Sequence, residues 1–388
     1  MLEDKADWLR LSLVPGVGND AARRLLAAFG LPKGIFEASE SALRQVVTPV
    51  QAAAVLQMPA KFEAKWVLTK AWLTNMTVGD EPGIPRRLVT LGDPDYPAAL
   101  LAIEDPPIVL YLLGRGEFGE AADQIQAARS VAMVGSRNPT HQGAENAQRF
   151  AKAFAGQGLT VVSGMALGVD GAAHQGALDG GQDGSLAVTV AVVGTGLDRV
   201  YPAQHRDLAH QIAAHGLLVS EYPLGTPPLS QNFPRRNRLI SGLTRGTLVV
   251  EAALQSGSLI TARMALEQGR DVFAIPGSIH SVQSRGCHAL IKQGAKLVES
   301  AEDVLEELKV QFTPKNIAVN LYTESRNDLF DAPSALLDAL GHDPVALDAL
   351  QARTGMDTAS LQAQLLMLEL DGQVARLPGG LFQRVGSA

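Results

Sequence analysis

The stretch SVAMVGSRNPTHQGAENAQRFAKAFAGQGLTVVSG, residues 130–164, decides the fold class. Two short and nearly all-apolar runs, SVAMV and LTVV, flank a segment whose apolar residues recur at helical spacing. Runs of this kind are typical of strands buried on both faces of a parallel sheet. The stretch therefore predicts a strand, a glycine-containing loop, a helix and a second strand.

The same alternation continues to about residue 300. Further apolar runs are LAVTVAVVG, GLLVSEY, GTLVVEA and RDVFAIPG, and the last two are separated by the amphipathic segment SLITARMALEQGR. Helices that alternate with buried strands predict an α/β fold with a doubly wound parallel sheet. An earlier run, PPIVLYLLG at residues 106–114, predicts one more strand.

The flanking segments predict further domains. We expect a small helical domain at residues 1–78, the α/β domain at 79–308, a linker at 309–327 and a winged-helix domain at 328–388. The first contains LSLVPGVGNDAARRLLAAFG, which fits a helix-hairpin-helix (SAM-like) unit whose turn offers N–H groups to a phosphate. A helical bundle with a ligand-free turn fits the same residues.

The predicted winged helix is acidic. Residues 328–388 contain eight acidic residues and three arginines, and its second predicted helix, in DTASLQAQLLMLELDG, has no cation. A winged helix that reads duplex DNA needs cations on that helix. The composition therefore favours a protein-interaction or regulatory role for this domain.

A loop of small residues follows almost every predicted strand of the α/β domain. These loops are GSRNPTHQG, SGMALGVDGAAH, GTGLDRVYP, EAALQSGSLITA and PGS. The carboxyl ends of parallel strands meet at one edge of a sheet, where ligands bind. Because glycine permits close approach and helix N-termini favour anions, the loops predict a phosphate-binding face.

The segment NFPRRNRLISGL, residues 232–243, concentrates positive charge in a chain of net charge -7. Arginine suits phosphate because its planar fork makes bidentate contacts, and an aromatic residue beside it is typical of single-stranded nucleic acid binding. GSRNPTHQG does not match the dinucleotide motif, and no P-loop motif occurs. The segment thus predicts a local site for a polyanion larger than one nucleotide.

Composition restricts the remaining possibilities. The single cysteine, Cys287, rules out an intrachain disulfide and a cysteine-rich zinc site. The start, MLEDKADWLR, has no apolar signal-peptide core, and the longest apolar run is too short to cross a bilayer. We expect a cytoplasmic protein without membrane contact, metal or cofactor.

Several of these motifs together carry a family resemblance. VGSRNPTHQG, SGMALGVDGAAHQGAL, GTGLDRVYP, SEYPLGTPP, FPRRNRLISGL, VVEAALQSGSLITARMALEQGRDVFAIPGS and GCHALIKQGAKLV, taken in this order, resemble the DNA-processing protein A family (DprA or Smf). The resemblance implies an extended Rossmann domain that binds single-stranded DNA and loads the RecA recombinase onto it in natural transformation. It implies a homodimer and no catalysis.

The resemblance also implies which residues contact or shape the DNA site. The residues carried over by motif are Gly135, Ser136, Arg137, Ser163, Gly164, Gly168, Asp170, His174, Phe233, Arg235, Arg236, Asn237, Arg238, Ser256, Gly257, Ser258 and Thr261. Family members often have a lysine shortly before the phenylalanine, and the residues LSQN here supply none.

Other interpretations of these residues remain open. Arg236 and Arg238 also fit a structural role, in which they cap a helix or pair with acids such as Glu221 or Glu251. Asp170 fits an N-cap, and His174 fits a hydrogen-bonded core residue. A different function, hydrolysis of nucleoside monophosphates by a phosphoribohydrolase-type fold, is disfavoured because Ala262 stands where that family has an acid.

Overall fold

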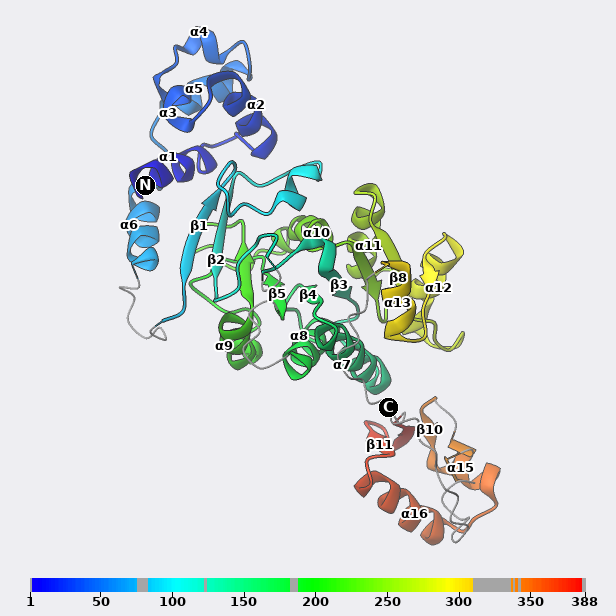
Figure 1. Cartoon of the computed structure of the whole chain (residues 1–388). Coiled ribbons are helices and arrows are strands. Elements are labelled where there is room, and N and C mark those ends of the chain that lie inside the picture. Colours follow the sequence, from blue (N-terminus) through cyan, green and yellow to red (C-terminus); the bar gives the residue numbers. More distant parts are fainter. Residues whose placement is uncertain are drawn as a thin grey trace. The chain divides into compact units, whose positions relative to one another are not determined.

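The computed structural model describes residues 2–74, 83–121, 124–181, 188–309, 336–337, 339–340 and 343–385 (Figure 1). The chain divides into two compact units, residues 1–138 with 146–310, and residues 139–145 with 311–388. The predicted domain boundary at residue 78 and the predicted linker, apart from Lys309, lie outside the described residues. No helix of the described residues is long and apolar enough to cross a membrane.

The larger unit is built on a nine-stranded sheet of order β1-β2-β6-β5-β4-β3-β7-β8-β9. The strands are β1 (Arg86–Thr90), β2 (Val109–Leu113), β3 (Ser130–Val134), β4 (Thr160–Ser163), β5 (Thr189–Val192), β6 (Leu217–Ser220), β7 (Gly246–Val249), β8 (Asp271–Ala274) and β9 (Lys296–Leu297).

The strands from β6 to β9 in this order run parallel to one another, as the apolar runs predict. β1 and β2 form an antiparallel hairpin, and β2 pairs antiparallel with β6. The parallel sheet therefore gains a mixed edge. The sequence pattern indicated neither β1 nor the two-residue β9.

Helices cover both faces of this sheet, and the carboxyl ends of the parallel strands open onto the loops between them (Figure 1). The helices after β3 are α7 (His141–Gly156), α8 (Val169–Gly180), α9 (Arg206–His215), α10 (Asn232–Gly242), α11 (Ser258–Glu267), α12 (Arg285–Lys292) and α13 (Ala301–Glu307). One apolar core joins the sheet to α10, α11 and α12. Another joins the opposite face to α7, α8 and α13.

The amino-terminal residues form six helices, as their composition predicts. They are α1 (Leu2–Ser12), α2 (Asn19–Phe29), α3 (Pro32–Glu37), α4 (Glu40–Leu43), α5 (Pro49–Leu56) and α6 (Phe62–Leu73). Their core is continuous with side chains of β2 and α9, including Tyr111 and Ile212. These helices are thus packed onto the edge of the sheet.

The turn between α1 and α2 has protein partners for both of its nearby arginines. Arg23 donates to Asp105 at 2.9 Å, and Arg24 donates to Asp20 and to the carbonyl of Val46, each at 3.1 Å. The same Asp105 carboxylate also accepts from Asn19. This arrangement favours the interpretation of the hairpin as a structural bundle.

The second unit contains the predicted winged helix. Helices α15 (Leu347–Thr354) and α16 (Thr358–Leu370) pack beside a sheet of order β10-β12-β11. The strands are β10 (Val345–Ala346), β11 (Val374–Leu377) and β12 (Leu381–Arg384), and the antiparallel pair of β11 and β12 forms the wing. α16 carries no cation, so it lacks the charge of a helix that reads duplex DNA.

Candidate nucleic-acid interface

A pocket of about 710 Å³ lies at the carboxyl ends of the parallel strands, between the loops after β3, β4, β5 and β7 and the amino-terminal half of α10. The predicted site residues that line it are Gly135, Ser136, Arg137, Asp170, Phe233, Arg236, Asn237, Ser256, Gly257, Ser258 and Thr261. The structure thus brings together residues from four motifs that are up to 126 positions apart, from Gly135 to Thr261.

The arginine-rich segment forms a helix, α10, which the sequence pattern did not indicate. Successive residues of a helix point about 100° apart, so Arg236 points away from the face that Arg235 and Arg238 share at i,i+3 spacing. Arg235 is exposed, Arg236 is 4% exposed, and Arg238 is half-buried. The three arginines therefore have three different environments.

Arg236 is held inside the protein beneath the pocket. Its Nη1 donates to the carbonyl of Gly164 at 2.6 Å and to the carbonyl of Val192, which places the guanidinium across the ends of β4 and β5. Burial lowers its pKa to about 10 and raises the pKa of the neighbouring Asp170 carboxyl, while each charge favours the ionised form of the other. Arg236 joins α10 to the sheet.

Gly164 is required by this packing. A Cβ at this position would lie 2.6 Å from Nη1 of Arg236 and 2.7 Å from Oδ2 of Asp170. Gly168 is required for two reasons, because its φ is +82° and a Cβ would lie 2.5 Å from the carbonyl oxygen of Ser136. These glycines, with Ser163, lie beneath the pocket and set its shape.

Arg238 does not line the pocket. Its two terminal nitrogens each donate to one oxygen of Glu221 at 2.6 Å, and Nη2 lies 3.4 Å from Asp105. The structural interpretation, in which Arg238 pairs with Glu221, is confirmed. A guanidinium already bound bidentately to a half-buried carboxylate is not available to a phosphate.

Arg137 and Phe233 form the exposed part of the site. The guanidinium carbon of Arg137 lies 5.9 Å from the centre of the Phe233 ring, and the Phe233 ring lies 5.7 Å from that of Tyr201. Arg137 has no ion pair among the described residues. A cation without an ion-pair partner, over the outer of two neighbouring rings, can hold a phosphate beside a stacked base.

The loop after β7 closes the other side of the pocket. The hydroxyls of Ser256 and Ser258 lie 2.7 Å apart, and Ser256 Oγ accepts from the Ser258 N–H at the amino end of α11. Thr261 follows on the first turn. Hydroxyls at a helix N-terminus are suited to an anion.

His174 departs from the predicted site. Its side chain is 0% exposed and hydrogen-bonds through Nδ1 to Thr189 Oγ1 at 2.7 Å. Burial lowers its pKa to about 3, so the imidazole is neutral at neutral pH. Because α8 places it in the core, His174 does not line the pocket, and its interpretation as a hydrogen-bonded core histidine is confirmed. Its part in shaping the DNA site stays a prediction.

Tyr201 and Ser230 line the pocket although neither was predicted as a site residue. Tyr201 ends the loop GTGLDRVYP, and an aromatic residue in a small-residue loop at this edge of the sheet is the signal that would have indicated it. Ser230 belongs to the segment LSQN, which contains no lysine. Its hydroxyl supplies no positive charge.

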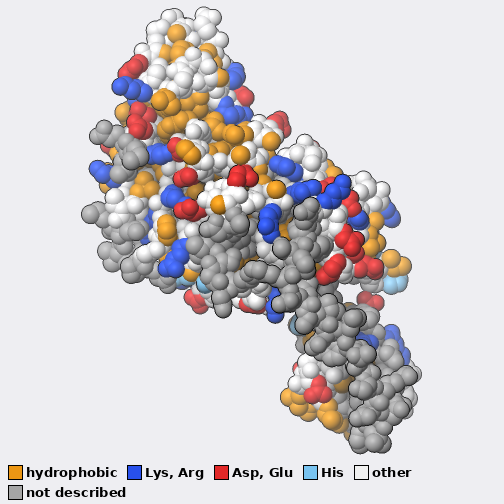
Figure 2. All heavy atoms as spheres, in the orientation of Figure 1, with side chains coloured by type: hydrophobic (Ala, Val, Ile, Leu, Met, Phe, Trp, Pro, Cys, Tyr) orange, Lys and Arg blue, Asp and Glu red, His pale blue; other side chains and the backbone are white. Residues whose placement is uncertain are grey.

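The pocket carries a small excess of positive charge. Figure 2 shows basic side chains scattered among acidic ones on the face that is drawn. The charged residues among those that line the pocket are Arg137, Arg236 and Asp170. With the exposed Arg235 on the same helix as the lining residues Phe233 and Arg236, this charge favours a polyanion at the pocket.

Comparisons with known proteins agree with this architecture. Residues 87–309 match the family described as DNA recombination-mediator protein A, and residues 323–380 match the DprA winged helix domain. Protein Smf of Escherichia coli is 43% identical over 290 residues, which cover 74% of each chain.

Two solved structures extend the likeness to the fold. The DNA processing protein A of Streptococcus pneumoniae matches with a TM-score of 0.57 and 37% identity, over 77% of this chain and 95% of that one. The protein from Helicobacter pylori, whose structure is described for its single-stranded DNA binding mode, matches with a TM-score of 0.50 and 29% identity, over 58% of this chain and 97% of that one. The chain belongs to the DNA recombination-mediator protein A family, also known as DprA or Smf.

Proposed function

We propose that this protein binds single-stranded DNA in the pocket at the carboxyl ends of its parallel strands. The observation that carries the proposal is the exposed Arg137 beside the rings of Phe233 and Tyr201. A cation takes the backbone phosphate and the rings take bases of any sequence. The relative from Helicobacter pylori, described for its binding of single-stranded DNA, supports this choice of ligand.

Single strands are favoured over duplex because of where the aromatic rings lie. Stacking on Phe233 requires an unpaired base, and the winged helix has no cation on α16 to enter a groove. We assign the winged helix a protein-interaction or regulatory role, which its eight acidic residues and three arginines support. The DNA site and this role belong to separate units of the chain.

The proposal extends to a wider role, which family membership supports. The protein protects incoming single strands in the cytoplasm, acts as a homodimer and loads the RecA recombinase onto DNA during natural transformation. Membership of a family described as recombination mediators supports this role. Loading is tested by strand-exchange assays in which RecA must displace a single-strand-binding protein, with and without the present protein.

In this proposal the protein binds DNA and catalyses no reaction, and the residues that line the pocket support this. The one carboxylate among the described lining residues is Asp170, which lies against Arg236 and is not free to act as a base. The competing phosphoribohydrolase function predicts release of free base from nucleoside monophosphates. Chromatography of such an incubation distinguishes the two functions.

The main test is a binding titration on four proteins. We expect Arg137→Ala and Phe233→Ala to weaken binding of a single-stranded oligonucleotide by about tenfold each, because one charged hydrogen bond or one stacked base is lost. Lys152→Ala is the control, because Lys152 is exposed on α7 and lines no pocket that the structure describes. Equal affinity of all four proteins, or tighter binding of duplex, would contradict the proposal.

A further inference from the structure

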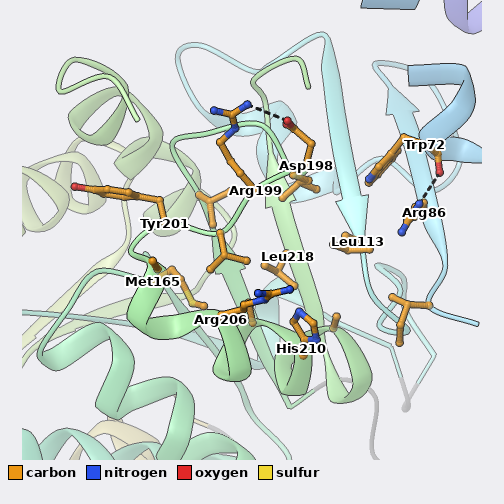
Figure 3. Close-up of a pocket in the computed structure, with 17 residues that line it drawn as sticks. Trp72, Arg86, Leu113, Met165, Asp198, Arg199, Tyr201, Arg206, His210 and Leu218 are labelled. Carbon is orange, nitrogen blue, oxygen red and sulfur yellow. Dashed lines mark hydrogen bonds and ion pairs between the residues drawn. The ribbon is translucent and has the colours of Figure 1, made fainter. Parts of the chain in front are cut away.

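A second cavity, of about 490 Å³, lies beside the DNA pocket in the same unit (Figure 3). It is lined by residues of α6, of strands β1, β2 and β6, of the loop after β5 and of α9. The side chains that enclose its interior are mostly apolar, among them Trp72, Leu113, Met165, Leu197 and Leu218. A cavity of this size and character accommodates a flat heterocycle.

The rim of this second cavity is basic. Three arginines line it, Arg86, Arg199 and Arg206, against a single acid, Asp198. Asp198 is occupied, because it accepts from Arg199 at 3.1 Å and from the Gly225 N–H at 2.7 Å. The cavity therefore retains an excess of positive charge after the ion pair is formed.

Arg206 is the available cation of this rim. It is exposed, and it makes no hydrogen bond or ion pair with any described residue. Arg206 is the first residue of α9, and its backbone N–H donates to the carbonyl of Ala203, so its guanidinium is the group that is available to an anion. Figure 3 shows its guanidinium next to His210, one helical turn further along the same face.

The two cavities share a wall. Tyr201 lines both of them. The loop after β4 also lies between them, because Met165 lines the second cavity and Ala166 lines the DNA pocket. In Figure 3 the Tyr201 ring points away from Arg206 and His210. That ring packs on Phe233 of the DNA pocket. A strand that passes from Phe233 over Tyr201 would therefore reach the second cavity.

We propose that the single strand continues over Tyr201 into the second cavity, where one base lies against the apolar interior and its phosphate is bound by Arg206. This proposal rests on the proposed function, since it extends the path of the same strand. Base and phosphate match the two parts of the cavity, an apolar interior and a rim with one unpartnered arginine. A free nucleotide shares this chemistry, but continuity with the DNA pocket favours the strand.

The test compares full-length wild-type protein, Arg206→Ala and Lys152→Ala on oligothymidylates lengthened one nucleotide at a time. On short oligothymidylates the three proteins should bind alike. Beyond the length at which the strand reaches Arg206, the Arg206→Ala protein should bind about tenfold more weakly, the effect of one charged hydrogen bond. Its slope of log affinity against log salt should also become shallower by about 0.7, and only at these lengths.

The outcomes separate this proposal from the one on which it rests. If Arg206→Ala matches the wild type at every length while single strands still bind, the strand does not enter the second cavity. If it weakens binding equally at all lengths, Arg206 acts through the general field of the protein and the proposed path is wrong. If thymidine monophosphate binding alone depends on Arg206, the cavity is a separate nucleotide site. Absence of wild-type binding would instead refute the proposed function.

Discussion

Replacing Arg236 by methionine should destabilise the protein more than it changes DNA binding. The substitution keeps the apolar stem and removes the guanidinium that donates to the carbonyls of Gly164 and Val192. It also leaves the buried Asp170 carboxylate without its main counter-charge. Breaking one side of a buried ion pair costs about 3–5 kcal/mol. At about 2–4 °C per kcal/mol for a large domain, the Tm should fall by about 10 °C.

The pH dependence of the Tm identifies Asp170 as the group that loses its counter-charge in Arg236→Met. Burial raises the pKa of Asp170, and removing Arg236, whose charge opposes that rise, raises it further. When a carboxyl has a higher pKa in the folded state than in the unfolded state, the free energy of unfolding falls as the pH rises from the unfolded-state pKa towards the folded-state pKa. The Tm deficit of Arg236→Met should therefore be smallest at about pH 4 and grow towards neutral pH.

Calorimetric scans at several pH values measure this deficit. Arg235→Met is the matched control, since Arg235 is exposed on the same helix and its replacement should leave the Tm unchanged. Adding Asp170→Asn to Arg236→Met should recover part of the lost stability. A normal Tm for Arg236→Met would refute the structural role, and a deficit independent of pH would show that Asp170 is not its partner.

The remaining predictions concern charge, packing and domain structure. If Arg137, which lines the pocket, and Arg235, which is exposed on α10, each meet one phosphate, short single strands should show a salt slope of about -1.4, and Arg137→Ala should halve it; a slope near -3 would mean that the buried arginines also meet phosphates. Gly164→Ala should lower the Tm by several degrees, because its Cβ would lie 2.6 Å from Arg236, whereas Gly257→Ala has open space and should not. Deleting residues 328–388 should change single-strand affinity by less than about twofold in a gel-shift titration, because that segment is acidic; a large loss in a folded truncation would assign it DNA contacts.

The sequence predicted those strands well that are buried on both faces of the sheet. Strands such as β3 and β5 are buried on both faces, so almost all of their residues are apolar and their pattern predicts buried strands clearly. The edge strand β1 begins with two arginines and carries no such signal. The parallel core was therefore predictable, and its antiparallel edge was not.

The arginines show why the site was only partly predictable. Their number and the nearby Phe233 indicated an anion site, but a charged residue's role depends on its partners. Those of Arg238 are Glu221 and Asp105, which lie 17 and 133 positions away, and no local pattern reports such pairings. The buried residues of α10 include Leu239 and Ile240. Their spacing alone did not predict a helix because charged residues make up much of the segment.

Asp105 gives the pocket a mechanical connection to the amino-terminal helices. One carboxylate oxygen accepts from Arg23 of α2, and the other lies 3.4 Å from Arg238 of α10. The helix that carries Phe233 is thus tethered, through a single side chain, to a separate group of helices. Displacement of α10 by a bound strand would strain the ion pairs that Asp105 makes with Arg23 and Arg238. A partner that fixed the position of α2 would therefore resist movement of α10 and of its Phe233.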